Sequence, residues 1–202
     1  MELKPFWEDL YANDDALSAF GEASPEVYDL GRKLPFRSRV LDLGSGDGRN
    51  AICLATLGHQ VSAVDISAAA LEKLQKRAVC RGLSVHVTPM DLGEYEIKGE
   101  YELVVAYGCL HLLHRPVRNR VLTEMQMHTA RGGYNIVVVF TDSLEPPEDL
   151  RPWMHGIFKE GEIFIAYEHW AVEVRESYIL SDEHPGGIRH QHAINKVIAQ
   201  RP

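Results

Sequence analysis

Cysteine is scarce in this sequence, and the cysteines that occur form no pattern. The 202 residues contain three, Cys53, Cys80 and Cys109, an odd number without a Cys-x-x-Cys pair. Neither a disulfide framework nor a cysteine-based metal site is therefore expected. Each cysteine lies in an apolar run, which favours reduced, buried thiols that fill the core of a cytoplasmic protein.

Long apolar stretches and an excess of basic residues are also missing. No run of 18 apolar residues occurs, and the first residues lack the apolar core of a signal peptide, so we expect no membrane association. Lys and Arg total 21 against 29 for Asp and Glu, which gives a formal net charge of −8. Such a charge repels phosphate backbones, so nucleic acid is not an expected partner.

From residue 39 onward, short β-branched apolar runs alternate with helical stretches. The predicted strands are residues 40–43, 61–64, 85–87, 103–106 and 136–140, and the predicted helices are 48–57, 67–81 and 116–130. Parallel strands need crossover connections, so this order predicts a Rossmann-like α/β fold with a doubly wound, mostly parallel sheet and helices on both faces. A helical stretch at 160–167 and two alternating stretches near 170–179 and 188–199 predict an antiparallel hairpin that closes the sheet.

Three glycines follow the first predicted strand directly. The stretch from Asp42 to Asn50 reads Asp-Leu-Gly-Ser-Gly-Asp-Gly-Arg-Asn, with glycine at 44, 46 and 48. Residues without side chains let a ligand touch the backbone, and the helix that follows offers unpaired N–H groups. Dinucleotide-binding loops space their glycines as Gly-x-Gly-x-x-Gly, so the spacing here argues against a dehydrogenase.

This motif resembles the first motif of class I S-adenosylmethionine-dependent methyltransferases. The resemblance implies that the glycine loop passes under the amino-acid part of the cofactor. At the entrance of the following helix, Arg49 is a candidate to pair with the cofactor carboxylate. A solvent-facing Arg49 is the structural alternative. S-adenosylhomocysteine would be the product.

Two acidic residues accompany the loop, one after each of the next two strands. Asp65 ends the second strand, where a carboxylate can accept hydrogen bonds from both ribose hydroxyls. The resemblance implies that Asp91 takes the adenine amino group and that Leu92 supplies a backbone amide, while Tyr107 borders the cofactor. The alternatives are a helix cap for Asp65 and a turn for Asp91. The residues expected to bind the cofactor are Asp42, Gly44, Ser45, Gly46, Gly48, Arg49, Asn50, Asp65, Ile66, Asp91, Leu92 and Tyr107.

Several longer stretches resemble the bacterial tellurite-resistance (TehB-like) methyltransferase family in particular. They are Leu41–Gly44 with Gly48-Arg49-Asn50, Met127–Asn135, Phe158–Glu162, Tyr167, Trp170 and Gly187-Ile188-Arg189. The resemblance implies a seven-stranded sheet and methylation of a small acceptor, a chalcogen oxyanion such as tellurite or selenite. No linker divides the chain, so we expect one methyltransferase domain over residues 1–202, with a helical lid (1–34), a cofactor-binding core (35–140) and a substrate loop with a hairpin (141–202).

Cations that hold an anionic acceptor are the expected catalytic groups. The resemblance assigns Arg189 to the substrate pocket, with His111 and His184 as further candidates; a histidine that precedes this arginine in the family does not align cleanly here. The pairs His111/His114 and His190/His192 suggest a metal site, but no cysteine or carboxylate set accompanies them, so no metal is expected.

Two other functions remain open alongside oxyanion methylation. A methyltransferase acting on a small organic thiol or another metabolite would use the same cofactor residues, and a noncatalytic S-adenosylmethionine-binding module would retain them without turnover. Trp7 and Tyr11, on a predicted first helix, are candidates for a lid over the cofactor. A monomer and a homodimer are both compatible with the sequence.

Overall fold

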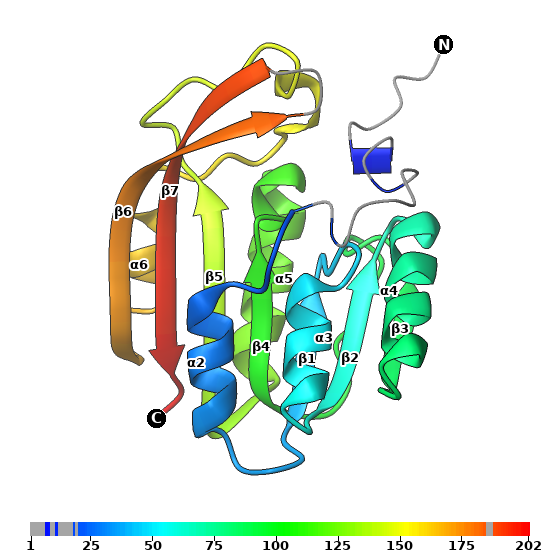
Figure 1. Cartoon of the computed structure of the whole chain (residues 1–202). Helices are drawn as coiled ribbons and strands as arrows, with labels where there is room; N and C mark the ends of the chain where they lie inside the picture. The colour runs from blue at the N-terminus through cyan, green and yellow to red at the C-terminus, as the bar shows by residue number, and fades with distance from the viewer. Residues whose placement is uncertain (1–6, 9–10, 12–17, 19, 185–187) are drawn as a thin grey trace.

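The chain forms one mixed sheet of seven strands (Figure 1). The computed structural model describes residues 7–8, 11, 18, 20–184 and 188–202, with the backbone alone for 182–184 and 188. The strand order is β3-β2-β1-β4-β5-β7-β6. The strands are β1 (Arg39–Leu43), β2 (Gln60–Asp65), β3 (Val85–Pro89), β4 (Tyr101–Tyr107), β5 (Thr129–Phe140), β6 (Ala171–His184) and β7 (Ile188–Gln200).

Neighbouring strands from β1 to β5 pair in parallel, whereas β7 pairs antiparallel with both β5 and β6. The predicted α/β fold with an antiparallel C-terminal hairpin is therefore confirmed. The carboxyl ends of β1 to β5 meet at one edge of the sheet, at the top of Figure 1, and the β6–β7 hairpin extends past that edge.

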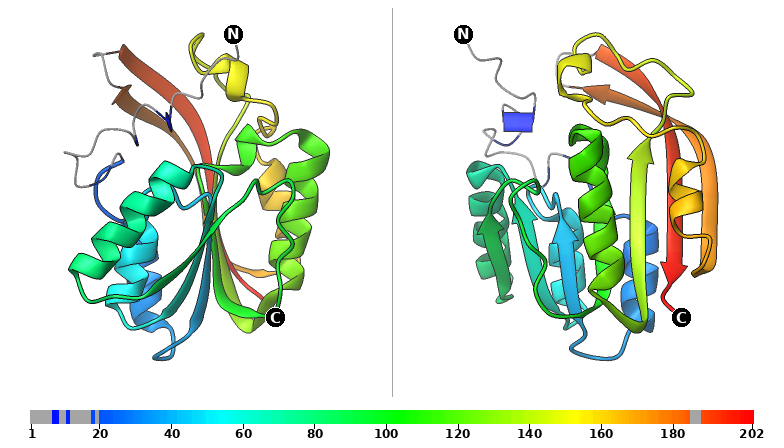
Figure 2. Two further views of the ribbon diagram at one scale, coloured as in Figure 1. Left: turned by 90° about the vertical axis from the view of Figure 1, so that its right-hand side faces the viewer. Right: turned by 180° about the vertical axis from the view of Figure 1, so that it is seen from behind.

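Helices cover both faces of the sheet (Figure 2). Apolar side chains of α2 (Pro25–Lys33), α3 (Arg49–Thr56) and α4 (Ala68–Cys80) pack on one face, and those of α5 (Arg115–Met127) and α6 (Glu162–Ala166) pack on the other. Strand β1 is buried on both sides because Val40 faces the first group of helices and Leu41 and Leu43 face the second. Two short 3₁₀ turns, η1 (Leu110–Leu112) and η2 (Arg151–Trp153), lie near the carboxyl edge.

Local sequence signals explain where several helices start. Pro25 follows Ser24 and occupies the first turn of α2, where its missing N–H costs no hydrogen bond. Ser67 caps α4, because its hydroxyl accepts a hydrogen bond from the amide of Ala70 at 3.3 Å. The predicted helical segment 1–34 is seen as α2 and as helical backbone at 7–8 and 11; most of residues 1–19 lie outside the described part.

Two sequence-based predictions about local structure are wrong. Helix α5 ends at Met127 rather than at residue 130, and β5 begins at Thr129, well before residue 136. Thr129 pairs with Tyr101 of β4 through a register irregularity, a tertiary contact that overrides the local pattern.

Cys80 is exposed and Cys53 is half-buried, so only Cys109 is the buried thiol expected of all three.

No helix in the described ranges combines the length and apolarity needed to cross a bilayer.

Candidate active site

A cavity of about 570 Å³ opens at the carboxyl edge of the parallel strands. One end lies at the glycine loop after β1, and the other lies among η1, η2 and the extended hairpin β6–β7. This is the crevice in which open α/β sheets bind ligands, because the loops after β1 and β4 diverge there. Of the residues predicted from the sequence, the cavity is lined by Asp42, Gly44, Ser45, Gly46, Arg49, Asn50, Asp65, Ile66, Asp91, Leu92, Tyr107 and His111.

Two predicted site residues do not line this cavity, and the side chain of a third lies outside the described part of the chain. Gly48 packs against Leu74 of α4 instead, and a Cβ atom at this position would collide with that side chain. Arg189 is exposed on β7, opposite Glu183 of β6, and is not part of the cavity wall. His184 ends β6, and its side chain lies outside the described part of the chain.

The first two glycines of the loop have conformations and neighbours that exclude side chains. Gly44 and Gly46 have φ angles of 65° and 54°, in the left-handed region. A Cβ atom on Gly44 would overlap Cys109, and one on Gly46 would overlap the hydroxyl of Tyr11. The loop therefore presents bare backbone to the cavity, as close approach of a ligand requires.

Asp42 places a buried carboxylate at this end of the cavity. Its side chain is 2% exposed, and burial raises its pKa to about 7, with nearby Arg49 opposing the rise and Asp65 adding to it. Its Oδ2 atom has no hydrogen-bond partner among the described residues. A buried oxygen of this kind is complemented by a cationic ligand group, which S-adenosylmethionine carries as an ammonium and a sulfonium. The buried Asp42 carboxylate therefore fits that cofactor.

Asp65 links the glycine loop to the start of α4. Its Oδ2 accepts a hydrogen bond from the Gly46 amide at 2.7 Å, and its Oδ1 accepts one from the Ser67 amide at 2.9 Å. Burial raises its pKa, while these amide hydrogen bonds oppose the rise. The helix-cap alternative is met only indirectly, because Ser67 is the N-cap of α4 and Asp65 accepts the Ser67 amide just before that helix. Each oxygen keeps a second lone pair for a ligand hydroxyl, so both roles are compatible.

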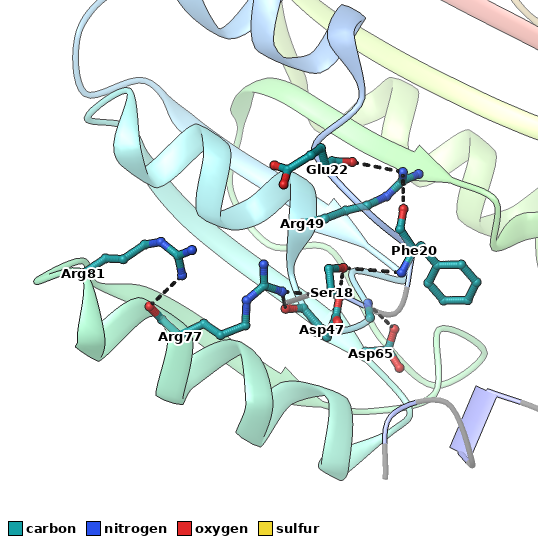
Figure 3. Close-up of polar contacts among 9 residues, drawn as sticks. Ser18, Phe20, Glu22, Asp47, Arg49, Asp65, Arg77 and Arg81 are labelled. Carbon is teal, nitrogen blue, oxygen red and sulfur yellow. Dashed lines mark hydrogen bonds and ion pairs between the residues drawn. The ribbon is translucent and has the colours of Figure 1, made fainter. Parts of the chain in front are cut away.

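Arg49 ties the segment before α2 to the loop (Figure 3). Its Nη1 donates to the carbonyls of Phe20 at 3.1 Å and Glu22 at 3.3 Å, and its guanidinium lies 5.0 Å from the Tyr107 ring centre. Asn50 makes a similar tether, since its Oδ1 accepts the amide of Ser24 at 3.0 Å. Arg49 is therefore not the freely solvated arginine of the structural alternative.

The loop after β3 is held from α5. Asp91 Oδ1 accepts the Gly93 amide at 2.7 Å, which is the turn considered as the alternative for this residue. Arg120 of α5 donates to the carbonyls of Leu92 at 3.1 Å and Gly93 at 2.7 Å. These bonds fix Leu92 in the cavity wall with its side chain buried.

His111 lies at the other end of the cavity within a stack of rings. Its ring lies 3.9 Å from that of Phe140, which in turn lies 4.3 Å from His192 of β7. Its Nδ1 accepts the Phe140 amide at 3.2 Å. Burial lowers its pKa to about 3, with His192 and Arg118 contributing, so the ring is neutral at physiological pH rather than the cation expected from the sequence.

Most of the wall around His111 escaped the sequence analysis. It comes from the segment between β5 and α6 and from the extended hairpin, where the only signal was the His-x-His pattern of 190 and 192. Both histidines are buried, yet no group of three potential metal ligands exists among the described residues. The lining residues that the sequence did not single out there include Phe140, Leu150, Trp153, Met154, His155, Tyr178, Leu180 and Ile194, whereas His192 belongs to the His-x-His pair.

Two N-terminal aromatic residues also line the cavity. Tyr11 is buried against Gly46, and Trp7 meets Trp153 of η2 edge to face, with ring centres 5.7 Å apart. The described part of the N-terminal segment therefore touches both ends of the site, as a lid would.

The comparisons with known proteins agree with this geometry. The sequence profile of a family described as tellurite resistance protein TehB matches residues 20–182. Over 132 residues, which are 65% of its length, this chain is 31% identical to hemagglutinin 1 of Eikenella corrodens. Over the same length it is 30% identical to the probable S-adenosyl-L-methionine-dependent methyltransferase TehB of Haemophilus influenzae strain 10810. The matches cover 43% and 46% of those proteins, so the chain aligns with less than half of either.

A tRNA 5-carboxymethoxyuridine methyltransferase of Escherichia coli K12 is 31% identical over 87 residues, covering 41% of this chain and 33% of that enzyme. The crystal structure of TehB from Haemophilus influenzae superposes with a TM-score of 0.79 at 23% identity, covering 89% of this chain and 62% of that one. The chain therefore belongs to the TehB family of class I S-adenosylmethionine-dependent methyltransferases.

Proposed function

We propose that this protein transfers a methyl group from S-adenosylmethionine to a small acceptor. The observation that carries the proposal is the single cavity that joins the glycine loop to the ring stack at His111, because it offers room for a donor and an acceptor side by side. The cofactor supplies an electrophilic methyl group on a positively charged sulfur. The chain then has to orient the acceptor about 3 Å from that carbon and to exclude water.

The cofactor end divides into three groups of contacts. The backbone at Gly44 and Gly46 passes under the amino-acid part, with the Asp42 carboxylate beside it, while Asp65 binds the ribose. Asp91 and Leu92 take the adenine. The common lining of one cavity supports this assignment. We assign residues 1–34 to a lid, 35–140 to the cofactor-binding core and 141–202 to the substrate loop and hairpin of a single cytoplasmic domain.

Two kinds of acceptor are candidates. A chalcogen oxyanion such as tellurite or selenite is supported by the description of the family, whereas Arg189, the residue expected to bind it, is exposed and does not line the cavity. A small organic thiol is favoured by the apolar residues of the cavity wall near His111, among them Leu150 and Met154. Nucleic acid is disfavoured by the net charge of −8, although the Escherichia coli relative is named for a tRNA substrate.

Release of S-adenosylhomocysteine tests the proposal. The protein is incubated with S-adenosylmethionine and, separately, with tellurite, selenite, a small thiol and tRNA, and the product is quantified by mass spectrometry. We expect acceptor-dependent release with a small molecule and none with tRNA. Binding of the cofactor without turnover of any acceptor would instead favour the noncatalytic module.

A further inference from the structure

The end of the cavity that would receive the acceptor is apolar. Leu150, Trp153 and Met154 from the η2 region face it, together with Phe140 of β5 and Leu180 of β6. Among the described residues that line the cavity, the one arginine is Arg49, and it is engaged with the carbonyls of Phe20 and Glu22 beside the glycine loop.

The fixed charges of the cavity wall are mainly negative. Asp42, Asp47, Asp65 and Asp91 all line it, and all lie at the cofactor end with Arg49. An acceptor carrying negative charge would leave water for a mainly apolar wall whose described residues at this end include no lysine or arginine, so that the sulfonium of the cofactor would be its main positive partner. This wall favours a molecule without net charge.

His111 is one of the polar groups at this mainly apolar end, where His155, Tyr178 and His192 also line the cavity. The Phe140 amide donates to its Nδ1, so the neutral ring must carry its proton on Nε2. No other hydrogen bond to the ring is recorded in the described part of the chain. The groups that face the ring are Phe140 of β5, His192 of β7 and the buried Arg118 of α5, and none of them is an anion that would draw a second proton onto it.

We propose that the acceptor is a small uncharged molecule with a soft nucleophilic atom, such as a thiol, and that His111 binds it as a fixed Nε2–H donor. This rests on the proposed methyltransferase function. In the reaction the thiol sulfur forms a bond to the methyl carbon as the bond from that carbon to the sulfonium breaks. The electron pair stays on the S-adenosylhomocysteine thioether, and the thiol proton passes to water. His111 holds the sulfur in place and takes no proton.

A charge series of thiols tests the acceptor class. The kcat/KM for S-adenosylhomocysteine formation is measured with 2-mercaptoethanol, mercaptoacetate and cysteamine, which are neutral, anionic and cationic, and with selenite. We expect the neutral thiol to exceed each charged acceptor by tenfold or more, on the order of the cost of one unpaired buried group.

Substitution of His111 tests the donor. His111→Leu should lower kcat/KM for the neutral thiol by about tenfold, the scale of one hydrogen bond, whereas His111→Gln keeps an N–H donor and should retain more activity. The exposed His169 provides the control, and His169→Gln should match the wild type. In nitrogen–proton NMR spectra, the His111 ring should stay in the neutral Nε2–H form from pH 6 to 8.

The outcomes separate this inference from the proposed function. A wild-type protein whose melting temperature does not respond to S-adenosylmethionine contradicts the methyltransferase itself. If the cofactor binds but selenite or mercaptoacetate reacts as well as the neutral thiol, or if none of the four reacts, the acceptor class is wrong while the cofactor site stands. A His111 ring that titrates between pH 6 and 8, or a His111→Leu variant with wild-type kcat/KM, overturns the role of the donor.

Discussion

Asp42 is the residue at which burial and charge oppose each other most directly in this molecule. Burial raises its pKa to about 7 from an ordinary value of 3.8. The folded protein therefore holds the Asp42 proton more firmly than the unfolded chain does. The resulting stability is fully present below about pH 4 and is lost as the pH rises to about 7.

Asp42→Asn should remove this loss. Without ligand, the free energy of unfolding of the variant minus that of the wild type should increase by up to about 4 kcal/mol between pH 4 and pH 8. Urea unfolding at both pH values measures the difference, with Asp29→Asn on the exposed face of α2 as the control. Identical pH dependence in the wild type and Asp42→Asn would refute the raised pKa.

Asp65→Ala should weaken the binding of S-adenosylmethionine by roughly 1.5–3 kcal/mol, because a charge-assisted hydrogen bond is lost and the Gly46 amide loses its acceptor. Calorimetric titration of the wild type and the variant measures the change. An unchanged dissociation constant would remove Asp65 from the cofactor site.

At the scale of the elements, α5 and α6 are joined by a buried ion pair. Arg118 of α5 is 1% exposed, and its Nη2 donates to both carboxylate oxygens of Glu162 at 3.0 and 3.1 Å. The guanidinium also lies 3.6 Å from the ring centre of Phe158, with Nε and Nη1 lacking partners in the described structure. This pair holds the start of α6 against the helix that follows η1.

Glu162→Gln should lower the free energy of unfolding by about 3 kcal/mol, because it leaves the Arg118 charge buried without a counter-charge. Adding Arg118→Met should recover most of that loss, since an apolar side chain then fills the same space. Chemical denaturation of the single and double variants gives both values. A double variant as unstable as Glu162→Gln would show that packing, rather than charge, dominates there.

The elements also show which features local sequence could reveal. Asp42, the glycines and Asp65 could be predicted because they lie at or directly after the carboxyl ends of β1 and β2, and parallel pairing brings those ends together. The boundary between α5 and β5 was misplaced because Thr129 is held in the sheet by its partner Tyr101, far away in sequence. The wall around His111 was missed for the same reason: Phe140 and His192 meet only once β7 has paired with β5.

At the scale of the whole molecule, the cavity lies where two parts of the chain meet. The parallel strands and the loop after β1 line the end proposed for the cofactor, and the region of η2 with the β6–β7 hairpin lines the end proposed for the acceptor. In Figure 2 this hairpin extends past the carboxyl edge of the parallel strands. Trp7 and Tyr11 contact one part each, at Trp153 and at Gly46. Binding of a cofactor should stabilise the folded chain, because a ligand that binds only the folded state shifts the folding equilibrium towards it.

A thermal-shift titration of the wild-type protein with S-adenosylmethionine, S-adenosylhomocysteine and NAD in parallel tests the central claim most directly. A ligand that binds only the folded state raises the apparent melting temperature as its concentration increases. The account predicts a saturable rise with S-adenosylmethionine and S-adenosylhomocysteine and none with NAD. A rise with NAD alone, or no rise with any of the three at millimolar concentration, would contradict it.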